Sequence, residues 1–169
     1  MEIGMVAAVS LNGIIGSDGK IPWPFYKEDM AHMHRIIDGS SIIMGRRTYE
    51  GLPHTWDCNY FVVSGQLAIR RKGEFSFKEG VATAMARHPS TSIYALGGTR
   101  IFNEAFRFAT KLYLTRIQDT YHGDTYFPAI PPYWQQTAVR PCPTNSKLVF
   151  ETWENLYVDG LPVPLQRRR

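Results

Sequence analysis

One carboxylate in this sequence stands where a ligand-binding or proton-managing acid would be expected. Asp29 lies in a helix-like stretch, Glu28 to Ile37, and the residues four and seven positions further on are apolar, Met33 and Ile36. These positions share one helix face, so Asp29 points toward the interior. A buried carboxylate without a partner is costly, and burial raises its pKa. Two interpretations follow: a hydrogen-bonded structural acid or helix cap, or an acid that binds a cationic or amidine-like ligand and manages a proton.

Two strand–glycine–helix connections could bind phosphate. The first strand ends at Gly45 and leads into Arg46 and Arg47. The free backbone N–H groups at a helix start, together with two guanidinium groups, suit a phosphate. The second strand is followed by Gly97 and Gly98, which let a ligand approach the backbone closely. Neither is a P-loop or a G-x-G-x-x-G fingerprint, and an ordinary tight turn is the alternative interpretation.

A loop rich in glycine and proline precedes Asp29. It runs from Gly16 to Pro24, and Trp23 stands between two prolines. Gly16 and Gly19 permit backbone angles that other residues resist, so we expect a loop over the edge of the sheet. The rigid apolar surface around Trp23 is interpreted either as a packing plug or as part of a site.

The elements that must position these residues alternate between strands and helices. Five apolar runs with turn residues at their edges are strand-like: Ile3 to Val9, Ser41 to Met44, Tyr60 to Val63, Ser92 to Leu96 and Lys111 to Ile117. The helix-like stretches between them are Glu28 to Ile37, Thr48 to Leu52, Lys78 to Arg87 and Arg100 to Phe106. This alternation predicts an α/β domain with a largely parallel sheet. Trp134 to Arg140 and Leu148 to Tyr157 have no helix between them, which predicts an antiparallel hairpin at the end of the sheet.

The composition agrees with one globular domain. The chain has 169 residues, of which 44% are hydrophobic and 20% charged, which excludes disorder, and no apolar run is long enough for a membrane span. Lys and Arg number 19 against 15 Asp and Glu, and three of the positive charges are Arg167, Arg168 and Arg169. The nearly neutral body argues against a nucleic-acid groove. We therefore predict a domain over residues 1–160 and a solvated basic tail over residues 161–169.

Other chemistries are not supported by the sequence. The five histidines show no zinc spacing with Cys58 or Cys142, so no metal site is expected. No G-x-S-x-G elbow is present, and neither cysteine has an obvious histidine partner. Two cysteines and an amino terminus without a basic region fit a reducing cytoplasm.

Taken together, these residues resemble those of the dihydrofolate reductase family. The resemblance runs from about Ile3 to Tyr157, and its fragments are specific in their order and spacing: Val6-Ala7-Ala8, Ile15-Gly16, Ile21-Pro22-Trp23, Asp29, Ile43 to Tyr49, Leu96-Gly97-Gly98, Lys111 to Thr115 and Gly123 to Pro128. It implies a single α/β domain with a mostly parallel eight-stranded sheet, flanking helices and a C-terminal antiparallel hairpin. It also implies that NADPH donates a hydride to C6 of 7,8-dihydrofolate while N5 is protonated.

The resemblance also implies a role for each matching residue. Asp29 matches the acid that holds the pterin N3 and 2-amino group, Thr115 matches its supporting threonine, and Trp23 completes the catalytic set. The implied substrate contacts are Val6, Ala7, Asp29, Met30, Met33, Leu52 and Thr115. The implied cofactor contacts are Ala8, Ile15, Gly16, Ile21, Gly45, Arg46, Arg47, Thr48, Ser64, Gly97, Gly98, Thr99, Arg100 and Phe102. The loop from Gly16 to Trp23 would be a mobile lid with Ile21 at its tip, and the Gly97-Gly98 bond would be cis.

Two positions depart from the family pattern. Family members usually have an arginine, which clamps the glutamate carboxylate of the substrate, shortly before the strand that here begins at Tyr60. In this chain Cys58 or a neighbour occupies that place, and Lys27 and Arg35 are the nearby cations. We expect weak recognition of the glutamate tail and altered sensitivity to antifolates such as trimethoprim. Phe102 stands where many members have a tyrosine beside the nicotinamide, so only a hydroxyl is lost.

The leading hypothesis is therefore an NADPH-dependent dihydrofolate reductase. Its alternatives are a reductase of another pterin or of a pyrimidine riboside phosphate, and a folate- or nucleotide-binding module without enzymatic activity. Intact Asp29 and Thr115, together with the lid, favour the first hypothesis. The expected partners are dihydrofolate or a related pterin and antifolate inhibitors, with no nucleic acid and no membrane. We expect a cytoplasmic monomer.

Overall fold

The computed structural model of the chain describes residues 1–52, 56–64, 76–158 and 161–162. Its strands are β1 (Ile3–Ser10), β2 (Ile14–Gly16), β3 (Ser41–Gly45), β4 (Asn59–Val63), β5 (Ile93–Ala95), β6 (Lys111–Ile117), β7 (Thr125–Tyr126), β8 (Trp134–Pro141), β9 (Leu148–Asn155), β10 (Tyr157–Val158) and β11 (Leu161–Pro162). Its helices are α1 (Lys27–Ile37), α2 (Arg46–Glu50), α3 (Phe77–Arg87) and α4 (Thr99–Ala105). The predicted basic residues Arg167, Arg168 and Arg169 lie outside the described residues.

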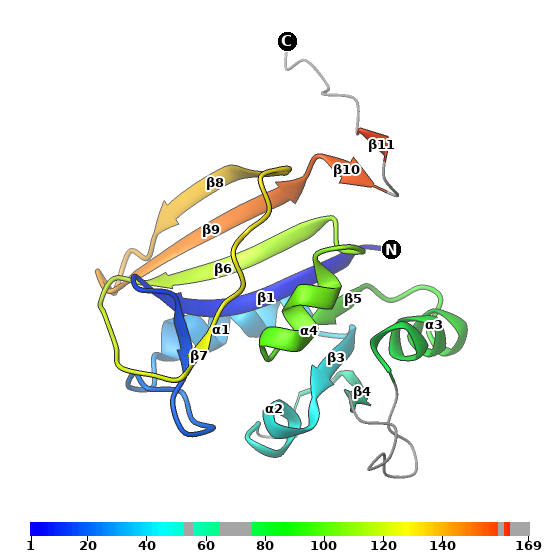
Figure 1. Cartoon of the computed structure of the whole chain (residues 1–169), viewed down its shortest axis with the longest axis horizontal. Coiled ribbons are helices and arrows are strands. Elements are labelled where there is room, and N and C mark those ends of the chain that lie inside the picture. Colours follow the sequence, from blue (N-terminus) through cyan, green and yellow to red (C-terminus); the bar gives the residue numbers. More distant parts are fainter. Residues whose placement is uncertain (53–55, 65–75, 159–160, 163–169) are drawn as a thin grey trace.

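A central sheet joins seven of the described strands in the order β4-β3-β5-β1-β6-β9-β8 (Figure 1). The first five of these strands pair in parallel, whereas β9 is antiparallel to both β6 and β8. The predicted α/β class, the largely parallel sheet and the C-terminal antiparallel hairpin are therefore confirmed. Among the described residues the sheet has seven strands, one fewer than the eight implied by the family resemblance.

Helices cover the two faces of the sheet, and the side chains of β3 illustrate why. Ile42 and Met44 belong to the apolar cluster under α1, while Ile43, between them, belongs to the cluster under α3 and α4. Successive residues of a strand point to opposite faces, so a continuous apolar run is buried on both sides. Figure 1 shows α1 behind the sheet and α4 in front of it.

Local sequence signals explain where two of the helices begin. Ser76 caps α3, because its hydroxyl accepts from the Glu79 backbone N–H and the Glu79 carboxylate accepts from the Ser76 N–H. In α1 the acidic residues Glu28 and Asp29 occupy the first turn, where the positive end of the helix dipole stabilises negative charge. The fold thus places Asp29 at a helix start that faces the sheet.

Two short pairings were not foreseen in the sequence. β2 pairs antiparallel with β7, and β10 pairs antiparallel with β11, which begins beyond the predicted domain boundary at residue 160. These strands have two or three residues, too few for a periodic pattern to be recognised. Within the described part of the chain, no helix has the length and apolar character needed to cross a membrane.

Candidate functional site

Asp29 of α1 and Thr115 of β6 form the polar centre of the site. Thr115 is buried, and its hydroxyl donates a hydrogen bond to the Asp29 carboxylate. The carboxylate lies largely in the interior, although the residue as a whole keeps part of its surface open. Burial raises the pKa of Asp29 above its ordinary value, and the bond from Thr115 opposes that rise. The inward orientation expected from helical spacing is confirmed.

An apolar wall borders this pair. Val6 of β1 is buried, and Met33 and Leu52 pack against the same cluster. The register of β1 with β6 pairs Ala8 with Thr115, so Val6 and Ala8 lie on the face that carries Thr115. Met30 is half-buried on the same helix as Asp29. The structure thus places three of the expected substrate contacts, Val6, Met33 and Leu52, in one cluster.

Ala7 is not one of these neighbours. Its side chain lies on the opposite face of β1, against the cluster under α3 and α4. Successive residues of a strand alternate between faces, so Ala7 can contribute only its backbone to the Asp29 side. Ile15 also packs against this second cluster rather than beside Asp29.

Trp23 fastens the end of the preceding loop to the sheet. Its buried side chain packs in a cluster with Ile117 and Phe150, and it meets the ring of Tyr121 edge-on with the ring centroids 5.7 Å apart. Ala8 packs against the same cluster. Trp23 therefore packs in the interior, and the same contacts place it next to the strand that borders Asp29, so packing and a part in the site both remain open interpretations.

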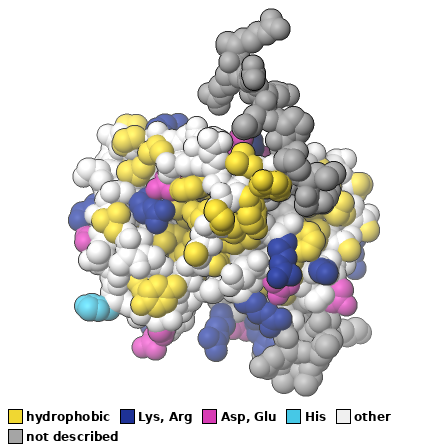
Figure 2. Space-filling model, turned by 45° about the horizontal axis from the view of Figure 1, so that its top comes forward, with side chains coloured by type: hydrophobic (Ala, Val, Ile, Leu, Met, Phe, Trp, Pro, Cys, Tyr) yellow, Lys and Arg dark blue, Asp and Glu magenta, His cyan; other side chains and the backbone are white. Residues whose placement is uncertain are grey.

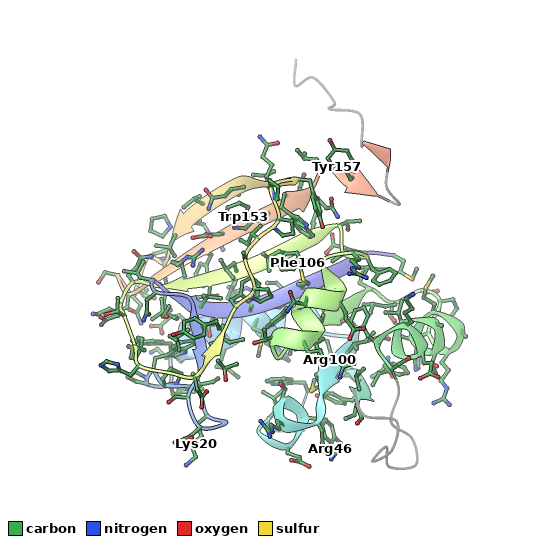
Figure 3. All side chains as sticks on the ribbon, viewed as in Figure 1. Lys20, Arg46, Arg100, Phe106, Trp153 and Tyr157 are labelled. Carbon is green, nitrogen blue, oxygen red and sulfur yellow. The ribbon has the colours of Figure 1, made fainter. Side chains whose placement is uncertain are left out.

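The loop before Trp23 contains a tight turn at its outer end. Ser17 and Lys20 exchange two backbone hydrogen bonds, of 2.8 and 2.9 Å, and the residues between them, Asp18 and Gly19, both have positive φ. This is the pattern of a turn that favours aspartate and glycine. The turn lies at Asp18 and Gly19, just before Ile21, the expected tip of the lid; Figure 3 shows Lys20 at the outer end of the loop. Ile21 follows it and is 63% exposed.

Asp124, which was not among the expected site residues, holds this loop. The Asp124 carboxylate accepts a hydrogen bond from the Asp18 backbone N–H at 3.1 Å, and the Asp124 N–H donates to the Gly16 carbonyl at 3.2 Å. The hydrogen bonds that the carboxylate accepts from the Thr125 hydroxyl and the Asp18 N–H keep the pKa of Asp124 below its ordinary value. At the preceding Gly123, a Cβ would lie 2.5 Å from the Gly16 oxygen. The fragment Gly123 to Pro128 was the only signal of this role in the sequence.

The two glycine connections lie side by side at the carboxyl ends of β3 and β5. The Gly45 N–H donates to the Gly97 carbonyl at 2.8 Å, and α2 and α4 begin directly after these glycines. The predicted cis bond between Gly97 and Gly98 is confirmed. Gly97 has φ +104°, and a Cβ there would lie 3.0 Å from the Phe102 ring. A Cβ at Gly98 would meet nothing within 4 Å, so the backbone there faces open space that a ligand could enter.

Cationic side chains stand at this edge, where Arg46, Ser64 and Arg100 were each expected to contact the cofactor. Arg46 donates to the hydroxyl of buried Ser64 at 3.4 Å. Arg100 forms an exposed ion pair with Glu104 at 3.3 Å on its own helix. Figure 3 shows Arg100 on α4 above Arg46 on α2, and Figure 2 shows several Lys and Arg side chains together in the lower part of its face.

The remaining expected cofactor residues border the same edge. Arg47 is exposed on α2, and its charge contributes to the low pKa of Asp124. Thr48 is half-buried one residue later. The Thr99 hydroxyl donates to the Tyr126 carbonyl at 2.7 Å, which ties the start of α4 to β7. In the described part of the chain, no three His, Cys, Asp or Glu side chains come together as ligands for a metal ion.

The segment without the usual arginine is held by a thiol. Cys58 is half-buried, its Sγ donates to the Ile37 carbonyl at the end of α1 at 3.2 Å, and burial raises the pKa of the thiol. A neutral thiol engaged with the backbone supplies no charge for a carboxylate. The two candidate substitutes, Lys27 and Arg35, are both exposed on α1.

Comparisons with known proteins agree with this geometry. A family model described as dihydrofolate reductase matches residues 2–155. A type 8 dihydrofolate reductase of Escherichia coli is 33% identical over 135 residues, which cover 75% of this chain and 80% of that protein. The dihydrofolate reductase of Buchnera aphidicola subsp. Acyrthosiphon pisum is 33% identical over 154 residues, 88% of this chain and 92% of that protein. A solved structure of Enterococcus faecalis dihydrofolate reductase, complexed with NADP(H) and RAB-propyl, has a TM-score of 0.77 and 25% identity, and covers 91% of this chain and 96% of that chain.

Proposed function

The chain belongs to the dihydrofolate reductase family and reduces dihydrofolate with NADPH, and on that premise we propose that Asp29 is the acid that binds the pterin. The observation that carries this proposal is the largely buried Asp29 carboxylate, hydrogen-bonded by Thr115 beside apolar Val6 and Met33. An interior carboxylate with one fixed donor has lone pairs left for a ligand, and the apolar wall suits a flat aromatic ring.

The proposed chemistry follows from the charge and shape of Asp29. The N3–H and 2-amino group of a pterin form an amidine-like pair of donors, which a carboxylate accepts in two parallel hydrogen bonds. Hydride transfer to C6 requires a proton at N5, and the negative charge of Asp29 in a partly dry pocket favours the protonated ring. Thr115 would help to orient the carboxylate, because its hydroxyl donates to it.

The residues at the carboxyl ends of β3 and β5 fit NADPH, which supplies a hydride when it is bound. The open space at Gly98 would admit a pyrophosphate close to the backbone at the start of α4. Arg46 and Ser64 together would bind the 2′-phosphate, since a guanidinium and a hydroxyl are matched donors for it. Phe102, packed against Gly97, would support the nicotinamide end of the site.

The loop from Gly16 to Trp23 is proposed to cover the reacting rings. Trp23 anchors its carboxyl-terminal end to the sheet, and the Asp124 bonds hold its outer turn. A cover of this kind excludes water and so strengthens the charge interactions inside. Exposed Ile21 would lie against the ligand when the loop closes.

The remaining expectations form part of the same proposal. Asp29, Thr115, Arg46 and Ser64 come from one chain, which supports action as a monomer. The cytoplasmic location and the division into a domain and a basic tail remain predictions. Both cysteines are unpaired, which is compatible with a reducing compartment.

The experiment that tests the substrate is a measurement of NADPH oxidation by the purified full chain. We expect consumption with 7,8-dihydrofolate and none with a pyrimidine riboside phosphate. A glutamate-free pterin, 7,8-dihydrobiopterin, is tested in parallel. Faster turnover of the riboside phosphate than of either pterin would contradict the proposal, and turnover of 7,8-dihydrobiopterin alone would move the substrate to another pterin.

A further inference from the structure

A row of side chains connects the partner of Asp29 with the far edge of the sheet. Thr115 of β6 lies opposite Phe150 of β9, and Phe150 lies opposite Arg140 of β8. Residues paired directly across neighbouring strands point to the same face. Phe150 is therefore an aromatic neighbour of Thr115 on the same face of the sheet. It has no role in the chemistry proposed above.

Helix α1 meets this row at two points. Asp29 bonds with Thr115, and His32, three residues later, stacks on Phe150 with ring centroids 4.0 Å apart and an interplanar angle of 29°. The Arg140 guanidinium carbon lies 5.7 Å from the centroid of the same phenyl ring. Residues three apart in a helix lie on one face, so both contacts restrict the same side of α1. Contacts with two adjacent strands fix the rotation of the helix over the sheet as well as its position along it.

The surroundings keep the His32 ring uncharged at neutral pH. Burial is the main cause, and the positive charges of Arg35 on α1 and Arg140 on β8 add to it, so that the pKa of His32 falls to about 4. A neutral imidazole stacks on a phenyl ring without the desolvation of a charge. It also places no positive charge beside the carboxylate that binds the pterin.

We propose that His32 is a positioning residue for Asp29. Its stack on Phe150 holds the first turns of α1 against β9, so that the Asp29 carboxylate remains within hydrogen-bonding reach of Thr115 and is presented correctly to the pterin. The proposal rests on the proposed role of Asp29. A displacement of about 1 Å at such a group can lower a rate by up to about 100-fold, which makes the contact measurable through catalysis.

Three variants test the stack. His32→Ala removes the ring and is expected to lower kcat/KM for dihydrofolate by about fivefold to twentyfold, with the KM for NADPH unchanged. His32→Phe keeps an aromatic ring and should restore kcat/KM to within about twofold of the wild type. His34→Ala is the matched control, because this exposed histidine of the same helix lies 3.7 Å from Asp38 and away from the row; it should behave as the wild type.

A double-mutant cycle shows whether His32 acts through the Asp29–Thr115 contact. In a Thr115→Val background, His32→Ala should lower kcat/KM by less than about twofold. The Asp29–Thr115 contact that His32 is proposed to preserve is already absent in that background. An undiminished effect in that background, or failure of His32→Phe to restore activity, would overturn the proposal. If His32→Ala does not fold, Phe150→Leu removes the stack from the other side and takes its place in the cycle. Wild-type activity of Asp29→Asn would instead overturn the role of Asp29 itself.

Discussion

At the scale of single residues, the position of Asp29 is explained by burial and one hydrogen bond. The carboxylate lies at the start of α1, where the helix dipole favours its charge, yet the apolar wall of Val6 and Met33 excludes water from it. Because burial outweighs the bond from Thr115, the pKa of Asp29 is raised. A buried, ionised carboxylate binds a cationic ligand well, but at neutral pH it lowers the stability of the ligand-free protein.

The first prediction concerns that cost. The folded protein holds the Asp29 proton more tightly than the unfolded chain does, so the favourable contribution of the protonated acid is complete below its ordinary pKa and is lost as the pH rises through the raised value. Asp29→Asn should therefore raise the Tm of the ligand-free protein at pH 7, by about 2–4 °C for each kcal/mol of relief. The difference should vanish below the ordinary pKa of aspartate. Calorimetric scans across this pH range measure it, and a lower Tm for Asp29→Asn at pH 7 would contradict it.

At the scale of elements, the site depends on connections whose turns bring distant segments together. The loop from Gly16 to Trp23 is held at two places, by the bonds of Asp124 to Gly16 and Asp18 and by the packing of Trp23 on the sheet. The connections after β3 and β5 meet through the bond from Gly45 to Gly97. These links join residues that are far apart in sequence, and each has a measurable consequence.

The second prediction is that Asp124→Ala loosens the loop without unfolding the protein. The variant removes the acceptor for the Asp18 N–H, and its residue is exposed, so we expect a Tm close to that of the wild type. A loosened loop would close over the reacting rings less often and would admit water to them. We therefore expect kcat to fall by about threefold to tenfold. Pre-steady-state hydride transfer measures this step directly. Thr144→Ala, an exposed substitution in the β8–β9 connection, serves as the control. A hydride-transfer rate equal to that of the wild type would show that the Asp124 bonds do not govern closure.

The third prediction concerns the choice between NADPH and NADH. Charge-assisted hydrogen bonds to a phosphate contribute about 1.5–3 kcal/mol each, so Arg46 and Ser64 should give NADPH an advantage of roughly tenfold or more in kcat/KM. Arg46→Ala should remove most of that advantage. Arg107→Ala removes an exposed cation just after α4 and should leave it unchanged. Equal use of both cofactors by the wild type would exclude this role.

At the scale of the whole molecule, the departure from the family that we expect lies where the glutamate tail of the substrate would bind. The end of α1 and the start of β4 meet through the Cys58 thiol, which bonds with the Ile37 carbonyl and carries no charge. A forked guanidinium would offer a carboxylate two parallel hydrogen bonds that a thiol cannot supply. In the proposed function, Asp29 and Thr115 supply the pterin end of the site, whereas the tail end lacks the expected arginine.

The fourth prediction is therefore a small preference for the glutamylated substrate. The kcat/KM for dihydrofolate should exceed that for dihydropteroate, which lacks the glutamate, by less than about threefold, the size of an exposed ionic contact. Cys58→Arg should widen the ratio by lowering the KM for dihydrofolate. A large preference in the wild type that disappears in Arg35→Ala would mean that an arginine of α1 has taken over the clamp.

Much of this molecule could be predicted from the sequence, for physical reasons that differ between its parts. The buried strands and the inward face of α1 follow from apolar periodicity, and Asp29 stood out as a charge on that face. The turn at Asp18 and Gly19, the bonds of Asp124 and the stack of His32 on Phe150 could not be found in this way. They depend on contacts between elements distant in sequence, which no local pattern records. The polar residues at helical spacing from His32, Glu28 and Arg35, gave no sign of its contact with Phe150.

The most direct test of the whole account is the kcat of Asp29→Asn at pH 7 with dihydrofolate and saturating NADPH. The amide keeps the shape of the side chain and loses the charge, so we predict a fall of about 100-fold or more, as for other electrostatic contacts made to a reacting group. Glu28→Gln is the matched control one residue away; its carboxylate is reached by Asn145 at 3.5 Å and should be replaceable with less than about a twofold change. Retention of more than about a tenth of the wild-type kcat by Asp29→Asn would contradict the account.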